Sequence, residues 1–548
     1  MASGATPAGE GGTPAPAPAC SPAERRALFI TLAAMLGATA AWLWSLPYLP
    51  FQDVPNHLHV LKLANAVADG RPVEGMRARD FFVFGYSAYF WVGRVLRHVF
   101  TAEQTLGAEV VFAAMALPAS LMLVARRLGS AAHAGWLALP LALSWPLRMG
   151  FVPYALALPF FFVWLRALPD LRDRRWLLGG AAALTASYVA HPMPYTVACP
   201  LAVVAFLTLD ERRLAHAARL AATLALPAAM LVADWLQGTF SQIEGTEQTW
   251  EPSPLIFRAP WHAVRQLVSR TLALTGPRDW LLAVPLLLLF AWLLVRKRDF
   301  DTSPPSREKR FLAWATGAAF ALAAVTPHSI GTTWLWGDRV GIFGFALLPV
   351  LLSNAWAGWR SPLRFAAPLA ILPLVFASWG DVRSRALEIR SRLEPAAHAP
   401  LKGRYLTYRL SELGLGRLSW NHGDYDSMRQ TCAYVLSLDG RTPYLFAFAR
   451  YLPVWFDSQQ FQEGTPAPRE WDANEGHSLA DDDAANAFDL RQIRKALEYR
   501  GYDGVIVFGS ARRVEKLGAQ LPAARLSPVP IGPGVLMFPI APTAPSTP

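Results

Sequence analysis

Charged residues are scarce in this chain. Of its 548 residues only 17% are Asp, Glu, Lys or Arg, whereas 53% are hydrophobic, and the mean hydropathy is +0.24. Soluble globular proteins carry roughly 25% charged residues, so this shortage argues against an ordinary soluble domain. The apolar residues occur in long blocks, and a membrane-crossing helix needs about 20 mostly apolar residues. The sequence therefore predicts a polytopic membrane protein.

Cysteine is almost absent, and so are the common nucleotide and hydrolase motifs. The three cysteines, Cys20, Cys199 and Cys432, stand far apart and form neither a CxxC nor a CxxH pair. A disulfide framework is therefore excluded, and a structural zinc site is not predicted. The chain contains no Walker A loop, no Gly-rich nucleotide motif after a strand and no GxSxG elbow. These absences argue against ATP-driven transport and serine hydrolysis.

Negative charge is also in short supply, because the formal net charge is +11. A nucleic-acid-binding protein of this charge would carry its basic residues as a patch on a folded domain. Here the arginines cluster beside the apolar blocks, at Arg25-Arg26, Arg126-Arg127, 172–175, Arg212-Arg213 and 296–298. That placement is typical of topology signals in membrane proteins. The predicted partner is the lipid bilayer, and no nucleic-acid partner is predicted.

The chain divides into a tail, a membrane part and a C-terminal domain. Residues 1–24, which are rich in Ala, Pro and Gly, are expected to form a disordered cytoplasmic tail. The first apolar block exceeds a signal peptide's core of about 7–15 residues, which favours an uncleaved anchor. The polytopic domain is expected over residues 25–380. Its apolar blocks lie at 27–47, 106–125, 133–148, 151–168, 177–194, 195–209, 217–236, 280–296, 311–328, 340–358 and 363–380.

Arg-rich and Arg-poor connections alternate along the membrane part. With the N-terminus inside, the Arg-rich connections fall on the cytoplasmic side, as the positive-inside rule requires. This parity predicts about eleven spans, outer loops at 48–105 and 237–279, and a C-terminus outside. The expected location is the inner membrane of a bacterium.

Residues 381–548 have a different character and are expected to form a small extracytoplasmic α/β domain. The pattern predicts a strand at 404–410, an amphipathic helix at 490–500 and a buried strand at 504–508. The acidic stretch at 481–483 is interpreted as a solvated loop. It lacks the Gly and the distal Glu of a calcium-binding loop. The overall fold class is an all-α membrane bundle followed by this α/β domain.

The first outer loop contains a second kind of helix. Pro55 suits the first turn of a helix that runs to Asp69, and Gly70 is expected to end it. Its apolar residues fall on one face, while His59 and Lys62 are expected to point elsewhere. The helix should therefore lie along the outer surface of the membrane.

Asp53 directly precedes this helix and permits two interpretations. Asp is favoured at helix starts, so in the first interpretation the carboxylate simply caps the helix. Alternatively, it serves as a general base or an electrostatic partner for a sugar or phosphate substrate. The sequence position alone leaves both open.

Asp53, Pro55 and His57 form an Asp-x-Pro-x-His loop after the first span. With the interfacial helix, the many further spans and the outer C-terminal domain, the chain resembles the GT-C superfamily of integral membrane glycosyltransferases. The resemblance covers nearly the whole chain in architecture, but its residue-level match is confined to these three positions. The Trp-Trp-Asp signature of oligosaccharyltransferases is missing, so peptide N-glycosylation is not implied.

The resemblance implies an inverting glycosyltransferase of cell-envelope polysaccharide synthesis. Such an enzyme moves a sugar from a polyprenyl-phosphate donor to a lipid, glycan or protein acceptor on the outer face of the membrane. It implies a catalytic role for Asp53 on the acceptor. The donor and the acceptor are the expected small-molecule partners. No cofactor is expected, and a divalent cation is the alternative left open.

The candidate substrate-binding residues are polar groups at the outer ends of the spans. They are His57, His59, Arg148, His191, Asp338 and Arg339. Arg148 or Arg339 would bind a lipid phosphate, because a guanidinium matches its oxygens bidentately. Two alternatives stay open: Asp338 and Arg339 as a solvated local pair, and His191 bonded to a carbonyl freed by Pro192.

The sequence also bears on a metal site and on two other functions. Asp53 with His57 and His59 would offer a divalent cation only one carboxylate, whereas hard cations prefer several oxygens. A non-enzymatic scaffold in envelope polysaccharide assembly would share this architecture without its chemistry. A secondary transporter would place charged residues or broken helices at mid-membrane depth in two related halves, which the sequence does not show.

Overall fold

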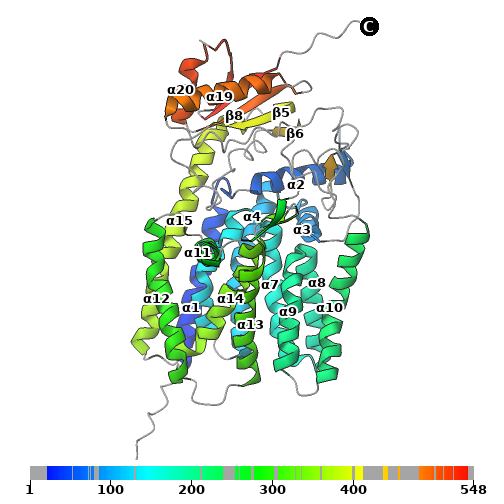
Figure 1. Ribbon diagram of the computed structural model, residues 1–548, viewed down its shortest axis with the longest axis vertical. Helices are drawn as coiled ribbons and strands as arrows, with labels where there is room; N and C mark the ends of the chain where they lie inside the picture. The colour runs from blue at the N-terminus through cyan, green and yellow to red at the C-terminus, as the bar shows by residue number, and fades with distance from the viewer. Residues whose placement is uncertain are drawn as a thin grey trace, which may run out of the picture.

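The chain folds into a helical bundle with a small α/β domain over one end (Figure 1). We call that end of the bundle the sheet-side end. The computed structural model describes residues 21–51, 53–71, 73, 76–78, 85–128, 131–209, 213–237, 253–257, 260–272, 274, 277–300, 306–327, 329–331, 333–334, 336–357, 359, 361–397, 401–410, 436–441, 454–456, 481–498, 502–509, 511–522, 524–532 and 534–540.

A helix occupies each of the predicted apolar blocks. Six of the helices in the described residues are long and apolar enough to cross a membrane: 22–44, 102–128, 152–170, 214–236, 278–296 and 336–353. These helices support the prediction of a membrane protein. The count of about eleven crossings stays a prediction. The bundle consists of α1 Pro22–Trp44, α4 Ala102–Leu128, α5 Ala131–Ala138 with the 3-10 turn η1 Leu139–Leu143, α7 Val152–Ala167 with η2 Leu168–Asp170, α8 Arg174–Ala190, α9 Met193–Thr208, α10 Arg213–Leu236, α12 Pro277–Phe300, α13 Arg307–Val325, α14 Trp336–Ala357 and α15 Ser361–Ala397.

Local side chains define where several of these helices begin. The Ser21 hydroxyl accepts from the Glu24 amide at 3.2 Å, and the Glu24 carboxylate accepts from the Ser21 amide at 2.8 Å. This capping box satisfies two amides that the first turn would otherwise leave without partners. The Asp173 side chain caps α8 by accepting from the Arg175 amide, and the Ser306 side chain caps α13 by accepting from the Lys309 amide.

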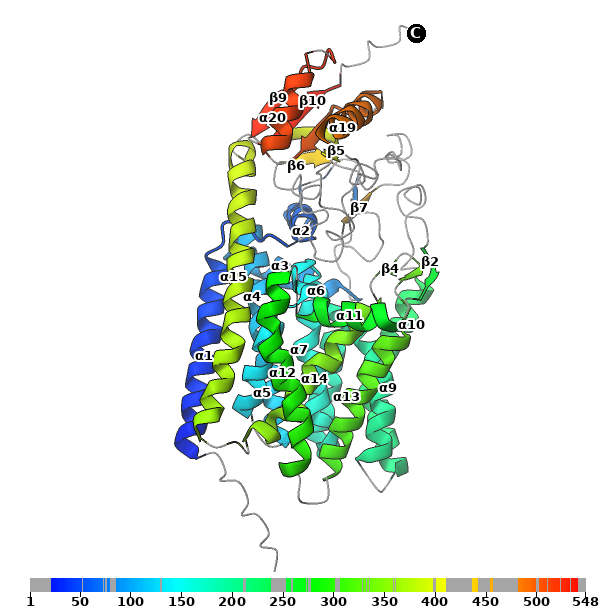
Figure 2. The ribbon, with the colours of Figure 1, turned by 60° about the vertical axis from the view of Figure 1, so that its left-hand side comes forward.

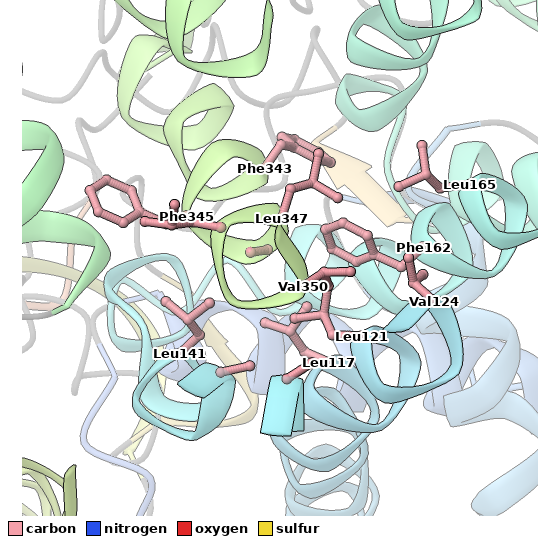
Figure 3. Packing of buried hydrophobic residues seen from close by; sticks show 14 of the residues in the cluster. Leu117, Leu121, Val124, Leu141, Phe162, Leu165, Phe343, Phe345, Leu347 and Val350 are labelled. Carbon is pink, nitrogen blue, oxygen red and sulfur yellow. The ribbon is translucent and has the colours of Figure 1, made fainter. Parts of the chain in front are cut away.

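The centre of the bundle is built from α4, α7 and α14. Figure 3 shows apolar side chains of these helices packing together, among them Leu121, Phe162 and Phe343. The Phe161 ring meets the Phe343 ring edge-on at 4.6 Å between centroids. Helices α10 and α12 are different, because many of their large apolar side chains are exposed, for example Leu281 at 73%. Exposed apolar faces of this kind are typical of helices that contact lipid.

Short elements gather at the sheet-side end. Helix α2, Val54–Ala68, lies across this end, between the bundle and the α/β domain (Figures 1 and 2). The other short elements are α3 Ser87–Leu96, α6 Trp145–Arg148 and α11 Pro260–Thr271, a three-stranded sheet of β2 Ser253–Ile256, β3 Ser329–Gly331 and β4 Thr333–Trp334, and β1 Met76–Ala78, which pairs antiparallel with β7 Val454–Phe456.

Helix α2 spans Val54–Ala68, which confirms the predicted helix, and Gly70 adopts the left-handed φ of +74° that its end requires. The predicted direction of His59 is wrong, because its side chain is 1% exposed. The helix contacts α3 and α4 below, and β6 and β7 on the domain side. It therefore has no broad polar face toward solvent.

The C-terminal domain is a five-stranded mixed sheet with two helices. The order is β6-β5-β8-β10-β9, in which β6, β5 and β8 are parallel and β10 is antiparallel to its neighbours. Its elements are β5 Leu401–Arg409, β6 Leu436–Arg441, α19 Asp482–Leu497, β8 Gly504–Phe508, α20 Ala511–Gln520, β9 Val529–Gly532 and β10 Val535–Pro539. The predicted strands at 404–410 and 504–508 and a helix over most of 490–500 are confirmed.

Two sequence-based boundaries need correction. The acidic stretch at 481–483 begins α19, where the Asp481 carboxylate accepts from the Ala484 amide at 2.8 Å, so it is a cap and not a loop. Helix α15 does not end near residue 380 but continues to Ala397, toward the domain (Figure 2). Charged residues past 380 keep the helix going, as the ion pair of Arg385 with Asp381 at 3.2 Å illustrates.

Candidate functional site

The candidate site is built around the residues 145–154, which we call the 145–154 corner. Helix α6 ends at Arg148, and Val152 begins α7 after a tight turn at Gly150. Gly150 has a φ of +77°, and a Cβ on it would lie 2.5 Å from the Asp53 nitrogen. Only glycine allows this close approach of two backbone segments. The corner therefore fixes where the start of α2 sits.

Asp53 is held against this corner. Its amide donates to the Met149 carbonyl at 3.1 Å, and the residue is 7% exposed. Although it occupies the N-cap position of α2, its side chain makes no capping hydrogen bond. The interpretation of Asp53 as a side-chain cap is therefore wrong. Its carboxylate is instead a buried group at the sheet-side end of the bundle.

His57 lies one turn further along α2 and reaches the same corner. Its side chain hydrogen-bonds to the backbone of Gly150, and its ring lies 5.3 Å from that of Tyr89. Burial lowers the pKa of His57 to about 4, so the imidazole is neutral at pH 7. The nearby His59 is more deeply buried, at 1% exposure.

Arg148 is committed to an ion pair. Its guanidinium donates to the Asp381 carboxylate at 2.8 Å and to the Ser378 hydroxyl at 2.5 Å. Both partners belong to α15, so this pair ties the corner to the helix that leads into the C-terminal domain. Ser378 also borders a small cleft of about 10 Å³, which has room for about one water molecule. Its other lining residues are Thr39, Leu139, Pro140, Ala142, Leu143, Leu272, Leu374, Val375 and Trp379.

Asp338 and Arg339 do not form the solvated local pair that was one interpretation. They are 6% and 8% exposed, and the Asp338 carboxylate pairs with Arg270. The Arg270 guanidinium also lies over the Trp145 ring, 5.0 Å from its centroid. Successive residues of a helix point about 100° apart, which sends the two side chains to different neighbours. Asp338 thus belongs to a structural ion pair.

Arg339 points to the other side, toward aromatic rings. Its guanidinium carbon lies 3.9 Å from the centroid of the Phe151 ring, and its side chain hydrogen-bonds with Tyr86. The Tyr154 hydroxyl donates to the Arg339 carbonyl at 2.6 Å, which fixes the backbone here. The buried Nε of Arg339 has no hydrogen-bond partner among the described residues.

Arg339 differs from the other buried arginines of the described residues. Arg148, Arg270, Arg364 and Arg513 each pair with a carboxylate, whereas Arg339 pairs with none in this part of the chain. A buried cation without a counter-ion is costly, because desolvation is not offset by an opposite charge. The side chain is therefore placed to receive an anion.

His191 joins this group through aromatic contacts. Its ring lies 4.3 Å from that of Tyr86 and 5.3 Å from that of Tyr154. The His191 Nδ1 accepts from the Met193 amide at 3.1 Å, so the expected bond to a freed carbonyl is not what this nitrogen makes. Burial and then the charge of Arg339 lower the pKa of His191 well below its usual range, so the ring is neutral at pH 7.

The structure thus brings several predicted residues to one place and leaves others out. Asp53 and His57 meet the 145–154 corner at Met149 and Gly150, and Arg339 meets it at Phe151. His191 follows through Tyr86 and Tyr154, while Arg148 and Asp338 are engaged in ion pairs. Sequence reasoning missed Tyr86, for which the sequence carries no signal.

Neither a metal centre nor a similar protein indicates the function of this chain. In the part of the chain that the structure describes, no three His, Cys, Asp or Glu side chains are grouped so as to hold a metal ion. No protein-family model matches the chain, and no curated protein is significantly similar to it. Function must therefore be argued from the geometry.

Proposed function

We propose that this protein is a membrane glycosyltransferase of the GT-C type. It transfers a sugar from a polyprenyl-phosphate donor to a hydroxyl of a lipid, glycan or protein acceptor. The observation that carries the proposal is Arg339, a buried guanidinium that pairs with no carboxylate of the described residues and meets the same corner as the buried Asp53.

The chemistry needs one anion site and one base. A phosphate at Arg339 would supply the missing counter-charge, and a guanidinium can hold two of its oxygens at once. The acceptor oxygen attacks the anomeric carbon, the bond from that carbon to the phosphate oxygen breaks, and the lipid phosphate leaves. Asp53 takes the acceptor proton, and the configuration at the sugar is inverted. The energy comes from the sugar–phosphate bond, so the protein needs no nucleotide.

The architecture supports a lipid-borne substrate. The bundle is built of apolar helices, and the candidate site lies at its sheet-side end. A lipid phosphate group would reach the site there from the membrane. In this proposal about eleven helices cross a bacterial inner membrane, the N-terminus is cytoplasmic, and the C-terminal domain is extracytoplasmic.

The test uses the purified protein in proteoliposomes. Polyprenyl-phosphate sugars with labelled hexose or pentose groups are offered together with an envelope lipid extract as acceptor. Asp53→Asn should lower transfer by roughly 10²–10⁴-fold, the range for a lost general base. Asp69→Asn is the control, because that carboxylate sits at the other end of α2 in half-exposed ion pairs with Arg71 and Arg97.

Two outcomes would contradict the proposal. Full transfer by Asp53→Asn would remove the assigned base. A wild-type protein that transfers none of the sugars, although polysaccharide assembly in cells depends on it and tolerates Asp53→Asn, would indicate a scaffold in envelope assembly.

A further inference from the structure

Tyr86 has an unusual backbone conformation. Its φ is 78° and its ψ is −1°, which lies in the left-handed region that glycine favours. A bulky L residue is strained there because its Cβ crowds the backbone. Such strain persists only where the surrounding structure holds it, and it concentrates at functional sites.

The surroundings of Tyr86 do hold it. The preceding amide, of Gly85, donates to the Asp234 carboxylate at 3.1 Å, and the Tyr188 hydroxyl donates to the same oxygen at 2.7 Å. Asp234 is 3% exposed, so this anchor is buried. A Cβ on Gly85 would lie 3.1 Å from the Pro192 ring, which leaves the turn little freedom.

The strained conformation sends the Tyr86 side chain into the candidate site. Its ring lies tilted against that of His191, with 4.3 Å between the centroids, and its hydroxyl hydrogen-bonds with the Arg339 side chain. Burial raises the pKa of Tyr86, so the hydroxyl stays neutral and does not cancel the charge of the guanidinium. Arg339 is thus held between the Phe151 ring and Tyr86 with its charge preserved.

We propose that Tyr86 is a positioning residue for a phosphate-binding site at Arg339. The inference rests on the proposed function, since it adds a second side chain to the same anion site. Tyr86 and Phe151 fix the plane of the guanidinium, so that its nitrogens are oriented before a phosphate monoester or diester arrives. Orientation before binding avoids the entropy cost of ordering a long side chain.

The test measures binding, not transfer. Full-length protein in nanodiscs is titrated with farnesyl phosphate and, separately, with inorganic phosphate. Tyr86→Phe keeps the ring and the backbone strain but removes the hydroxyl, and should weaken farnesyl phosphate binding about tenfold, as expected for a lost hydrogen bond to a charged group. Tyr195→Phe, whose hydroxyl contacts the Leu224 carbonyl at 3.4 Å, is the matched control and should bind normally.

Thermal unfolding tests the strain separately. Tyr86→Gly and Tyr86→Ala both remove the ring, but only glycine accepts a φ of 78° without cost. The glycine variant should therefore unfold at the higher temperature, which reverses the usual order of the two residues. An unfolding temperature higher for alanine would overturn the strain argument.

The outcomes separate this inference from the proposed function. Equal affinity of Tyr86→Phe and wild type would overturn the positioning role. A wild type that binds neither phosphate compound would overturn the anion site and the inference with it. A wild type that binds farnesyl phosphate but transfers no sugar would contradict only the glycosyltransferase proposal.

Discussion

Two carboxylates of α4 lie in very different surroundings. Glu103, at the start of the helix, is half exposed and pairs with Lys62 at 2.6 Å. Glu109, less than two turns later, is 3% exposed, and neither of its oxygens has a hydrogen-bond partner among the described residues. The proposed mechanism has no use for Glu109. Its carboxyl is therefore expected to cost stability.

We expect Glu109→Leu to raise the unfolding temperature of the detergent-solubilised protein by several degrees. A buried polar group without partners costs about 1–3 kcal/mol, and a leucine of similar volume removes that cost. Circular dichroism during heating gives the measurement, and Glu103→Leu, which breaks an ion pair, should not raise the temperature. A marked loss of stability in Glu109→Leu would mean that the carboxyl has a partner role in the fold.

At the residue level, the sequence predicted which side chains carry charge near the site but not what each one meets. Arg148 and Arg339 were equal candidates for a phosphate, since both stand at the ends of apolar blocks. The difference is that Asp381, far along the chain, reaches Arg148 and no carboxylate of the described residues reaches Arg339. A partner separated by so much sequence leaves no local pattern, and neither does the left-handed backbone of Tyr86.

At the scale of the elements, the hydrophobic blocks and turn residues of the sequence predicted the positions of most helices and strands. The start and end signals of α2, Pro55 and Gly70, were sufficient to place it. Its surroundings were not, because an amphipathic pattern indicates one buried face and cannot show that a second layer covers the other. The end of α15 was misplaced for a related reason: a change from apolar to charged residues marks a change of solvent, and a helix can continue through it.

The turn at Gly150 gives a test of how one element positions another. Gly150→Ala would place a Cβ 2.5 Å from the Asp53 nitrogen and 2.8 Å from the Val54 nitrogen, both backbone atoms that cannot rotate away. We expect a loss of about 2–4 kcal/mol in unfolding free energy, from the positive φ and the clash together. Farnesyl phosphate binding should suffer as well, because Phe151 moves with the corner.

A glycine in open space is the control for that substitution. Gly37 lies within α1, and a Cβ there meets nothing within 4 Å. Gly37→Ala should therefore leave binding unchanged and stabilise the helix by roughly 0.5–1 kcal/mol. Chemical unfolding in mixed micelles compares the two variants. If both alanine variants unfold alike, the corner does not constrain α2 as described.

On the scale of the whole molecule, the first loop and the C-terminal domain form one assembly. Strand β1 pairs with β7, and Tyr48 packs against the cluster that contains Ile389 and strand residues of the domain. Helix α2 is enclosed between the two parts, and Asp53 lies at its start. The side of the membrane on which the domain lies therefore decides the side on which the candidate site works.

That dependence makes the topology a decisive prediction. The alternation of Arg-rich and Arg-poor connections predicts that the N-terminus is cytoplasmic and that the domain is outside. Alkaline phosphatase fused after Pro548 should be active, because it folds only in an oxidising compartment, and a green fluorescent protein there should be dark.

A truncated fusion supplies the internal control. The chain is truncated after residue 209, before an Arg-rich connection, and each reporter is fused there. The pattern should then be reversed, with an inactive phosphatase and a bright fluorescent protein. Because α2 and the candidate site lie on the same side as the domain, the full-length result applies to both. An inactive phosphatase and a bright fluorescent fusion after Pro548 would place Arg339 and Asp53 on the cytoplasmic side. Transfer from an externally facing polyprenyl-phosphate sugar would then be excluded, whatever the site binds.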